Sequence, residues 1–219
     1  MSKTLFLLVA FIHVYFVAST QKPANPNPGN SDTDKELAAV FNALHVARED
    51  SNKVKLLLSL CTYHWKNRRN PTNKDSLTRY AKEARKLSKT VHFTSGFNEA
   101  SFMLGRSYLF GHEVSKAINL LNEAPKDEQS RFLISIGEYY LFLPGQERKN
   151  LDSASYYFTD ALKTAQLMGQ EKWKHESLIA LGKYYFSDGQ FSKAKNCFLQ
   201  IIDDFQRSGN RSAALLRVR

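Results

Sequence analysis

The sequence predicts an all-α fold in which antiparallel helix pairs stack in a row, with about four repeats and an N-terminal capping helix. Apolar residues recur at the three-to-four spacing of a helix face, and the alternation typical of strands is absent. Glycine occupies one register of three predicted helices, at Gly105, Gly137 and Gly182. Because glycine in a helix interior costs about 1 kcal/mol relative to alanine, its recurrence favours repeated helix packing over an irregular helical bundle. At 219 residues and 42% hydrophobic content, the chain can bury a continuous core without metal or disulfides.

The clearest repeat covers residues 173–207. Its signature positions, spread over two helices, are Leu181, Gly182, Tyr185, Ala194 and Phe198. The segment 187–190 predicts a turn, because its Asp and Gly tolerate the backbone conformations of a chain reversal. Gly182 and Ala194 are small, so we expect the two helices to touch at these positions.

Three further repeats are predicted at residues 51–93, 97–128 and 130–169. Their residues at the signature positions are Leu60, Cys61, His64, Leu77 and Ala81; then Leu104, Gly105, Tyr108, Ala117 and Leu121; and finally Ile136, Gly137, Tyr140, Ala154 and Phe158. Gly182 follows Gly105 by 77 positions. Long inter-helix segments lengthen the first and third units, so the repeating unit of the sequence is two helix pairs.

The spacing of these residues resembles the tetratricopeptide repeat pattern L-G-x-x-Y…A-x-x-x-F. The resemblance implies a right-handed superhelical solenoid in which the first helix of each pair lines the inner, concave surface. The tryptophan of that pattern is absent, since the corresponding residues are Ser101, Leu133 and Leu178.

The N-terminal segment differs from the rest of the chain. Residues 1–20 combine a lysine, an apolar run of about 15 residues and small residues at Ala18 and Ser19, which predicts a cleaved secretory signal peptide. The alternative is an uncleaved membrane anchor, but the run is shorter than the roughly 20 residues that span a bilayer. Residues 21–31 are rich in Pro and Asn and predict a disordered linker.

The two ends of the predicted row of helix pairs differ from the repeats between them. A capping helix is predicted at residues 32–50, where Thr33 and Glu36 fit a capping box. Such a helix would cover the exposed end of the first repeat. Residues 211–219 predict the start of a truncated further helix. Either the chain is a fragment of a longer protein, or this segment docks as a stub on the fourth repeat.

The sequence lacks the motifs of known catalytic and metal chemistry. Cys61 and Cys197 lie in the first and last predicted repeats, too far apart for the roughly 7 Å Cα separation of a disulfide, so both are expected to be small buried residues. His112 and His175 each precede a Glu, but neither has a second His four residues later, which excludes the zinc-protease motif. We expect no enzyme activity, no catalytic residue, no metal and no cofactor.

The chain is basic, with a formal net charge of +10. Basic residues gather in and beyond the first long inter-helix segment, at Lys66, Arg68, Arg69, Arg79, Lys82, Arg85, Lys86 and Lys89. Such a balance usually indicates nucleic acid, but an exported protein does not meet genomic DNA. We expect a protein or peptide partner. Acidic proteins, anionic lipid head groups and acidic glycans would use the basic surface, and a merely solvated basic face is the simplest alternative.

The candidate binding residues lie on the outward face of the predicted first helices. With the motif Leu as position seven, positions five, nine and twelve are Leu58, Thr62, Trp65, Phe102, Arg106, Leu109, Ile134, Glu138, Leu141, Ile179, Lys183 and Phe186. Two apolar tracks with a polar line between them suit an amphipathic helix or an extended peptide. The alternative is that positions five and twelve pack against neighbouring repeats. Exposed aromatic hot spots are expected at Trp65, Phe102, Phe142 and Phe186.

Residues 31–219 as a whole resemble the exported tetratricopeptide sensor region of Bacteroidota two-component histidine kinases. The resemblance rests on residues 50–60, 75–77 and 151–154, together with the predicted signal peptide. It implies a periplasmic sensor region of a Gram-negative bacterium, whose kinase and membrane-spanning parts would lie outside this chain. The alternatives are a free-standing exported scaffold for envelope assembly or surface capture, and an intracellular repeat adaptor.

Overall fold

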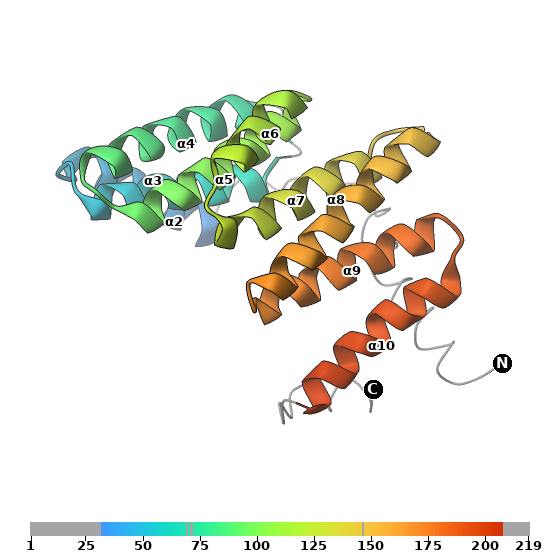
Figure 1. Ribbon diagram of the computed structural model, residues 1–219. Coiled ribbons are helices and arrows are strands. Elements are labelled where there is room, and N and C mark those ends of the chain that lie inside the picture. Colours follow the sequence, from blue (N-terminus) through green and yellow to red (C-terminus); the bar gives the residue numbers. More distant parts are fainter. Residues whose placement is uncertain (1–31, 69, 71, 146, 208–219) are drawn as a thin grey trace. The chain divides into compact units, whose positions relative to one another are not determined.

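The computed structural model describes residues 32–68, 70, 72–145 and 147–207, and this part of the chain contains helices and no strands (Figure 1). The helices are α2 (Asp32–Val46), α3 (Ser51–Lys66), α4 (Thr72–Thr90), α5 (Thr94–Phe110), α6 (Val114–Glu123), α7 (Lys126–Leu141), α8 (Arg148–Leu167), α9 (Glu171–Ser187) and α10 (Phe191–Arg207). The predicted all-α class is therefore confirmed. The predictions for residues 1–31 and 211–219 lie outside the described residues.

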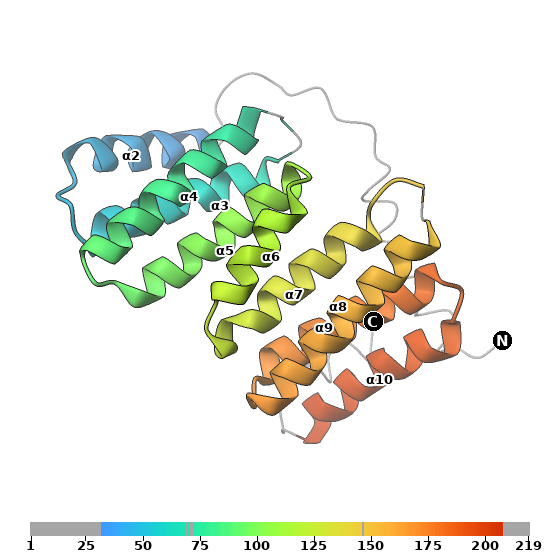
Figure 2. The same ribbon diagram turned by 45° about the horizontal axis from the view of Figure 1, so that its top comes forward.

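The chain divides into two compact units, residues 1–38 and 39–219, and the packing described below belongs to the second. Within it, each helix from α3 to α10 packs against the next one along the chain (Figures 1 and 2). The helices α3, α5, α7 and α9 also contact one another in succession. This is the arrangement that a helical repeat produces, because each helix pair buries its apolar face against its neighbours.

Four helix ends share one turn geometry. His92, His112, Gly169 and Gly189 have φ values of 52°, 59°, 62° and 74°, which place them in the left-handed region. After each of them, an amide donates a 2.8 Å hydrogen bond to the carbonyl five residues earlier: Phe93 to Ser88, Glu113 to Tyr108, Gln170 to Ala165 and Gln190 to Tyr185. Gly169 follows His92 by 77 positions, and Gly189 follows His112 by the same spacing. These turn conformations thus recur at the same spacing of 77 residues as Gly105 and Gly182 in the sequence.

The helix contacts explain the recurring glycines. A Cβ atom added at Gly137 would lie 2.5 Å from Phe158 Cε1, and one added at Gly182 would lie 2.6 Å from Phe198 Cζ. In α7–α8 and in α9–α10, therefore, the phenylalanine of the second helix rests directly on the glycine of the first. Gly105 differs, because its nearest neighbour is the ring of Phe132, at 2.9 Å in α7.

The apolar core lies between the helices of each pair. Leu57, Leu60 and Leu77 are fully buried on α3 and α4, and Ile136 and Phe158 are fully buried on α7 and α8. At 25 cal/mol per Å² of apolar surface, each such side chain contributes about 1.5–3 kcal/mol relative to an exposed position. The stability of this chain is therefore distributed along the row of pairs.

The start of α3 is capped by a side chain, and of the two cysteines that were expected to be buried only Cys61 is. The Asp50 carboxylate caps α3 by accepting hydrogen bonds from the amides of Asn52 and Lys53, at 2.8 and 3.1 Å. The preceding helix ends at Val46, four residues before the predicted limit at 50. Cys61 is free and buried, and burial raises the pKa of its thiol to about 12, whereas Cys197 is free and half-buried. Among the described helices, none has the length and apolar character to cross a bilayer.

Candidate functional site

The predicted binding residues on or next to α3, α5, α7 and α9 together form what we call the first-helix face. They fall into three groups by the exposure of their side chains. Those that are buried are Phe102, Leu109, Ile134 and Leu141. Those that are half-buried are Leu58, Thr62, Trp65, Arg106, Glu138, Ile179 and Lys183. The exposed ones are Phe142 and Phe186, at 68% and 38%. All four residues at positions five and twelve on α5 and α7 therefore pack inside the protein, as the alternative interpretation of the apolar tracks expected.

Phe102 does not provide the exposed aromatic ring that its position in the sequence led us to expect. Its exposed fraction is only 9%. The ring meets the edge of Phe132 at a centroid distance of 5.3 Å, and the Arg131 guanidinium lies 4.4 Å from the ring centroid. These neighbours belong to α7, so the Phe102 ring fills a contact between α5 and α7.

A polar line runs across the first-helix face, with one residue from each helix. Thr62 on α3 donates a 3.0 Å hydrogen bond from its hydroxyl to the carbonyl of Leu58, so this hydroxyl is already used within its own helix. On α7 and α9, the Lys183 ammonium lies 3.7 Å from the Glu138 carboxylate. Both side chains of this ion pair remain part-exposed. The line thus offers a partner a mixed set of charges.

Arg106 on α5 is the unusual member of the polar line. Its guanidinium carbon lies 3.8 Å from the centroid of the Trp65 ring on α3. Burial lowers its pKa to about 10; Glu138 opposes this effect, and the charge of Arg68 adds to it. The Nε atom is buried and has no hydrogen-bond partner among the described residues. The half-buried guanidinium therefore has no ion pair with a carboxylate of the described residues.

A second arginine approaches the same indole ring. Arg68, which follows α3, places its guanidinium carbon 4.5 Å from the Trp65 centroid and donates a 3.2 Å hydrogen bond to the Trp65 carbonyl. The sequence pattern marked Arg68 only as part of a basic loop, because the residue lies beyond the predicted helix register. The fold brings it to Trp65 and Arg106.

A neighbouring buried arginine forms ion pairs with carboxylates. Arg131 on α7 is also buried, but it forms ion pairs with Glu99 on α5 and Glu128 on its own helix. These carboxylates offset the charge of Arg131, although its Nε atom, like that of Arg106, is buried without a hydrogen bond among the described residues. Sequence reasoning missed this network, because Glu99 and Arg131 belong to different helix pairs and no motif links them.

Aromatic side chains are exposed at the far end of the first-helix face. Phe142 caps the C-terminus of α7, and Phe186 lies in the last turn of α9. The ring of Phe186 contacts that of Phe191, the first residue of α10, at a centroid distance of 5.3 Å. Phe191 is 60% exposed and escaped the sequence pattern, because it belongs to a second helix.

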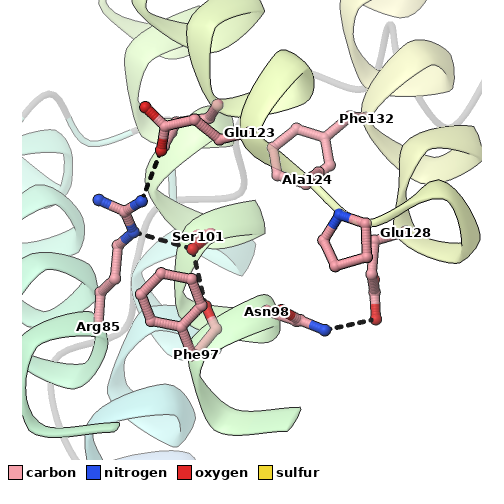
Figure 3. Close-up of a pocket in the computed structure, with 10 residues that line it drawn as sticks. Arg85, Phe97, Asn98, Ser101, Glu123, Ala124, Glu128 and Phe132 are labelled. Atoms are coloured by element: carbon pink, nitrogen blue, oxygen red, sulfur yellow. Dashed lines mark hydrogen bonds and ion pairs between the residues drawn. The ribbon is translucent and has the colours of Figure 1, made fainter. Parts of the chain in front are cut away.

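One small cavity, drawn in Figure 3, is lined by none of the residues of the first-helix face. It has a volume of about 120 Å³ and is formed by α4, α5, α6, α7 and the segment 124–125. Figure 3 shows its polar groups pairing with one another: Arg85 donates to Ser101 Oγ at 2.9 Å and to Glu123 at 2.8 Å. Ligand pockets usually measure about 300–1,000 Å³, so this cavity is too small for most organic ligands.

The described residues also contain one cluster with the chemistry of metal ligands. Glu171, His175 and Asp204 place their ligand atoms within 4.8 Å of one another. However, the Lys174 ammonium lies 2.7 Å from Glu171 and 2.8 Å from Asp204. Lysine thus supplies the positive charge that a metal ion would bring, and the cluster joins α9 to α10 as an ion-pair network.

The site therefore consists of the first-helix face, with an indole and two guanidiniums at one end and exposed phenylalanines at the other. Comparison with models of known protein families and with curated proteins finds no match for this chain.

Proposed function

We propose that this protein is a non-catalytic protein- or peptide-binding module of the tetratricopeptide type, and that its ligand lies along the first-helix face. The observation that carries the proposal is the succession of contacts among α3, α5, α7 and α9, which aligns Thr62, Arg106, Glu138 and Lys183 in one polar line. The recurring glycine–phenylalanine contacts and the shared turns support a right-handed solenoid of four repeats.

The proposed cellular role is that of a periplasmic sensor or input region of a two-component signalling protein. It is supported by the signal-peptide pattern of residues 1–20 and by the resemblance of residues 31–219 to exported sensor regions. In this role the chain binds a protein or peptide, uses no cofactor and does not contact nucleic acid.

Binding along the first-helix face is tested by selecting peptides that bind the purified full chain and measuring their affinity calorimetrically. Trp65→Ala and Phe186→Ala are expected to weaken the selected peptides about tenfold or more, as loss of an aromatic anchor does. Tyr156→Ala is the matched control, because Tyr156 is 65% exposed on α8, a second helix. Equal losses in all three variants, or no loss in the first two, would contradict binding at this face.

The cellular role is tested separately by immunoblotting fractions of the native cells with an antibody against residues 32–207. The sensor role predicts a band well above 25.0 kDa in the membrane fraction. A soluble periplasmic band slightly below that mass would overturn the sensor role and support a free-standing exported scaffold. Binding at the first-helix face is compatible with either result and is decided by the calorimetry alone.

A further inference from the structure

We propose that the outward side of α4 binds the surface of a membrane that contains anionic phospholipids. The residues that bind are four exposed basic ones, called here the basic stripe: Arg79, Lys82, Lys86 and Lys89. Their spacing of three or four residues places them in one row along the helix. Because α4 is the second helix of its pair, the basic stripe shares no residue with the first-helix face, and it is independent of the proposed peptide binding.

The positive charge of the chain is concentrated in the helix pair that carries the basic stripe. Residues 51–93 contain 11 Lys and Arg and only two acidic residues, Asp75 and Glu83, which gives a net charge of +9 out of +10 for the chain. The segment 77 positions later, residues 128–170, contains four Lys and Arg and five Asp and Glu, a net charge of −1. Both segments form a pair of long helices followed by a left-handed turn. The fold therefore does not require this charge.

The individual positions of the basic stripe show the same contrast. At the equivalent positions of α8, 77 residues later, the chain has Tyr156, Thr159, Lys163 and Gln166. These four side chains are exposed too, and only one of them is basic. Exposure to water alone thus does not produce a row of cations in this repeat. The basic stripe is a feature of one helix pair, on a side that the other pair leaves nearly neutral.

The basic stripe has no anionic partner in the described part of the chain. None of its side chains forms an ion pair with a described carboxylate, and Lys82 acts on Glu113 only at longer range. Other basic residues of α4 are paired: Arg85 lies 2.8 Å from Glu123, and Lys74 lies 3.9 Å from Glu113. Like charges at this helical spacing repel one another, so a negatively charged surface would relieve the repulsion.

The composition of α4 favours a lipid surface over other anionic partners. Three of the four residues of the basic stripe are lysines, whose ammonium groups act as point charges and need no fixed fork geometry. Every apolar side chain of α4 is buried, so the stripe has no apolar or aromatic neighbour on its own helix to anchor a partner. Protein interfaces have a core that is poor in lysine, and single-stranded nucleic acids stack on aromatic rings. Phosphate head groups need neither, and each basic residue near them strengthens binding about fivefold.

Membrane binding is tested with the full chain and vesicles of two compositions, phosphatidylcholine alone and phosphatidylcholine with about 30 mol% phosphatidylglycerol. Sedimentation of the vesicles measures the bound fraction of the protein. Neutral vesicles measure the contribution of the apolar run in residues 1–20, which is the same in every variant. We expect binding to the anionic vesicles to be tighter by about a hundredfold or more, and this difference to shrink as the ionic strength rises from about 0.05 to 0.5 M.

Two variants that each remove four positive charges then assign the binding to α4. The stripe variant combines Arg79→Gln, Lys82→Gln, Lys86→Gln and Lys89→Gln. The control variant changes four exposed lysines on other helices and combines Lys126→Gln, Lys163→Gln, Lys193→Gln and Lys195→Gln. The stripe variant should bind the anionic vesicles at least about tenfold more weakly than the native chain, and the control variant less than about threefold. Circular dichroism confirms that both variants are folded.

Labelling of lysines in the native chain gives a second readout that does not depend on the folding of a variant. An amine-reactive reagent, mapped by mass spectrometry, should label Lys82, Lys86 and Lys89 more slowly when anionic vesicles are present. Lys163 and Lys195 should be labelled at an unchanged rate. Equal protection of both groups, or equal losses of binding in both variants, would mean that net charge alone attracts the protein and would overturn the basic stripe as the binding site.

A soluble polyanion separates the lipid surface from other partners of the basic stripe. A single-stranded oligonucleotide is titrated into the native chain and into the stripe variant under the same conditions. We expect weaker binding than to the anionic vesicles, because α4 offers no exposed ring on which bases could stack. Binding of the oligonucleotide through the stripe, without a preference for anionic over neutral vesicles, would overturn the lipid surface as the partner. Peptide binding at the first-helix face is unaffected by either result.

Discussion

His92 and His112 occupy turn positions whose backbone favours glycine. Their φ values of 52° and 59° lie in the left-handed region, and the equivalent turns 77 residues later use Gly169 and Gly189. A side chain with a Cβ atom pays about 1–2 kcal/mol in this region. The two histidines are therefore local sources of strain that the repeat tolerates in its first half.

Replacing His92 by glycine should stabilise the protein. Relief of the left-handed strain exceeds the added entropy of glycine in the unfolded chain, so the expected gain is about 0.5 kcal/mol or more. Urea unfolding monitored by circular dichroism measures the free-energy difference. His112→Gly is the comparison, and its gain should be smaller, because the His112 ring contacts Tyr139 with a 3.2 Å Nδ1–Oη distance. A loss of stability in His92→Gly would contradict this account.

Replacing Gly137 by alanine should destabilise the protein although alanine is the better helix former. The new methyl would lie 2.5 Å from Phe158, whose ring is fully buried and cannot move away freely. Overpacking of this kind costs about 1–3 kcal/mol, which exceeds the propensity gain of about 1 kcal/mol over all but the lower end of that range. The cleaner readout is a double-mutant cycle with Phe158→Leu, measured by urea unfolding.

In the Phe158→Leu background, Gly137→Ala should lower the free energy of unfolding by less than in the native chain, because the smaller leucine side chain leaves room for the methyl group. Neighbours in contact commonly show coupling of about 0.5–3 kcal/mol. An additive cycle would show that the glycine is not retained for the phenylalanine ring.

At the scale of elements, α10 is joined to α9 by charge as well as by packing. Asp204 lies 2.8 Å from the Lys174 ammonium and 3.3 Å from His175 Nε2, and it also pairs with Arg207 at 2.9 Å. The hydrogen bond from Lys174, opposed in part by burial, holds the pKa of Asp204 below its ordinary value of 3.8. The network ties α10 to α9 through Lys174 and His175, while Arg207 pairs with Asp204 within α10.

This lowered pKa gives the network a defined pH dependence. A carboxyl whose pKa is lower in the folded state stabilises the fold above its unfolded pKa, and the contribution is lost as the pH falls through the folded pKa. Unfolding free energies measured between about pH 6 and pH 2 should therefore decrease below about pH 4. Asp204→Asn should flatten this decrease. Asp203→Asn is the matched control on the exposed neighbour, and an equal effect of both variants would dismiss the network as the cause.

At the scale of the whole molecule, sequence periodicity predicted the structural features that short stretches of sequence determine. The helical class and the shared register of Gly137 and Gly182 follow from spacing and propensity. The burial of Phe102 and the approach of Arg68 to Trp65 depend on how neighbouring helices pack, which spacing alone does not encode. The candidate face was therefore chosen from the sequence, and the contacts of its side chains became visible only in the fold.

A row of helix pairs should also respond locally to damage. Among the described elements, α10 packs against α9 alone, and neither contacts α3 or α4. Gly182→Ala would place a methyl 2.6 Å from the Phe198 ring and push α10 away. Hydrogen exchange followed by mass spectrometry should then show faster exchange in α10 and unchanged protection in α3 and α4, because nearest-neighbour contacts carry the stability of a repeat protein. Faster exchange throughout the chain would mean that the helices unfold as one cooperative unit, and the stability could not then be divided among the pairs.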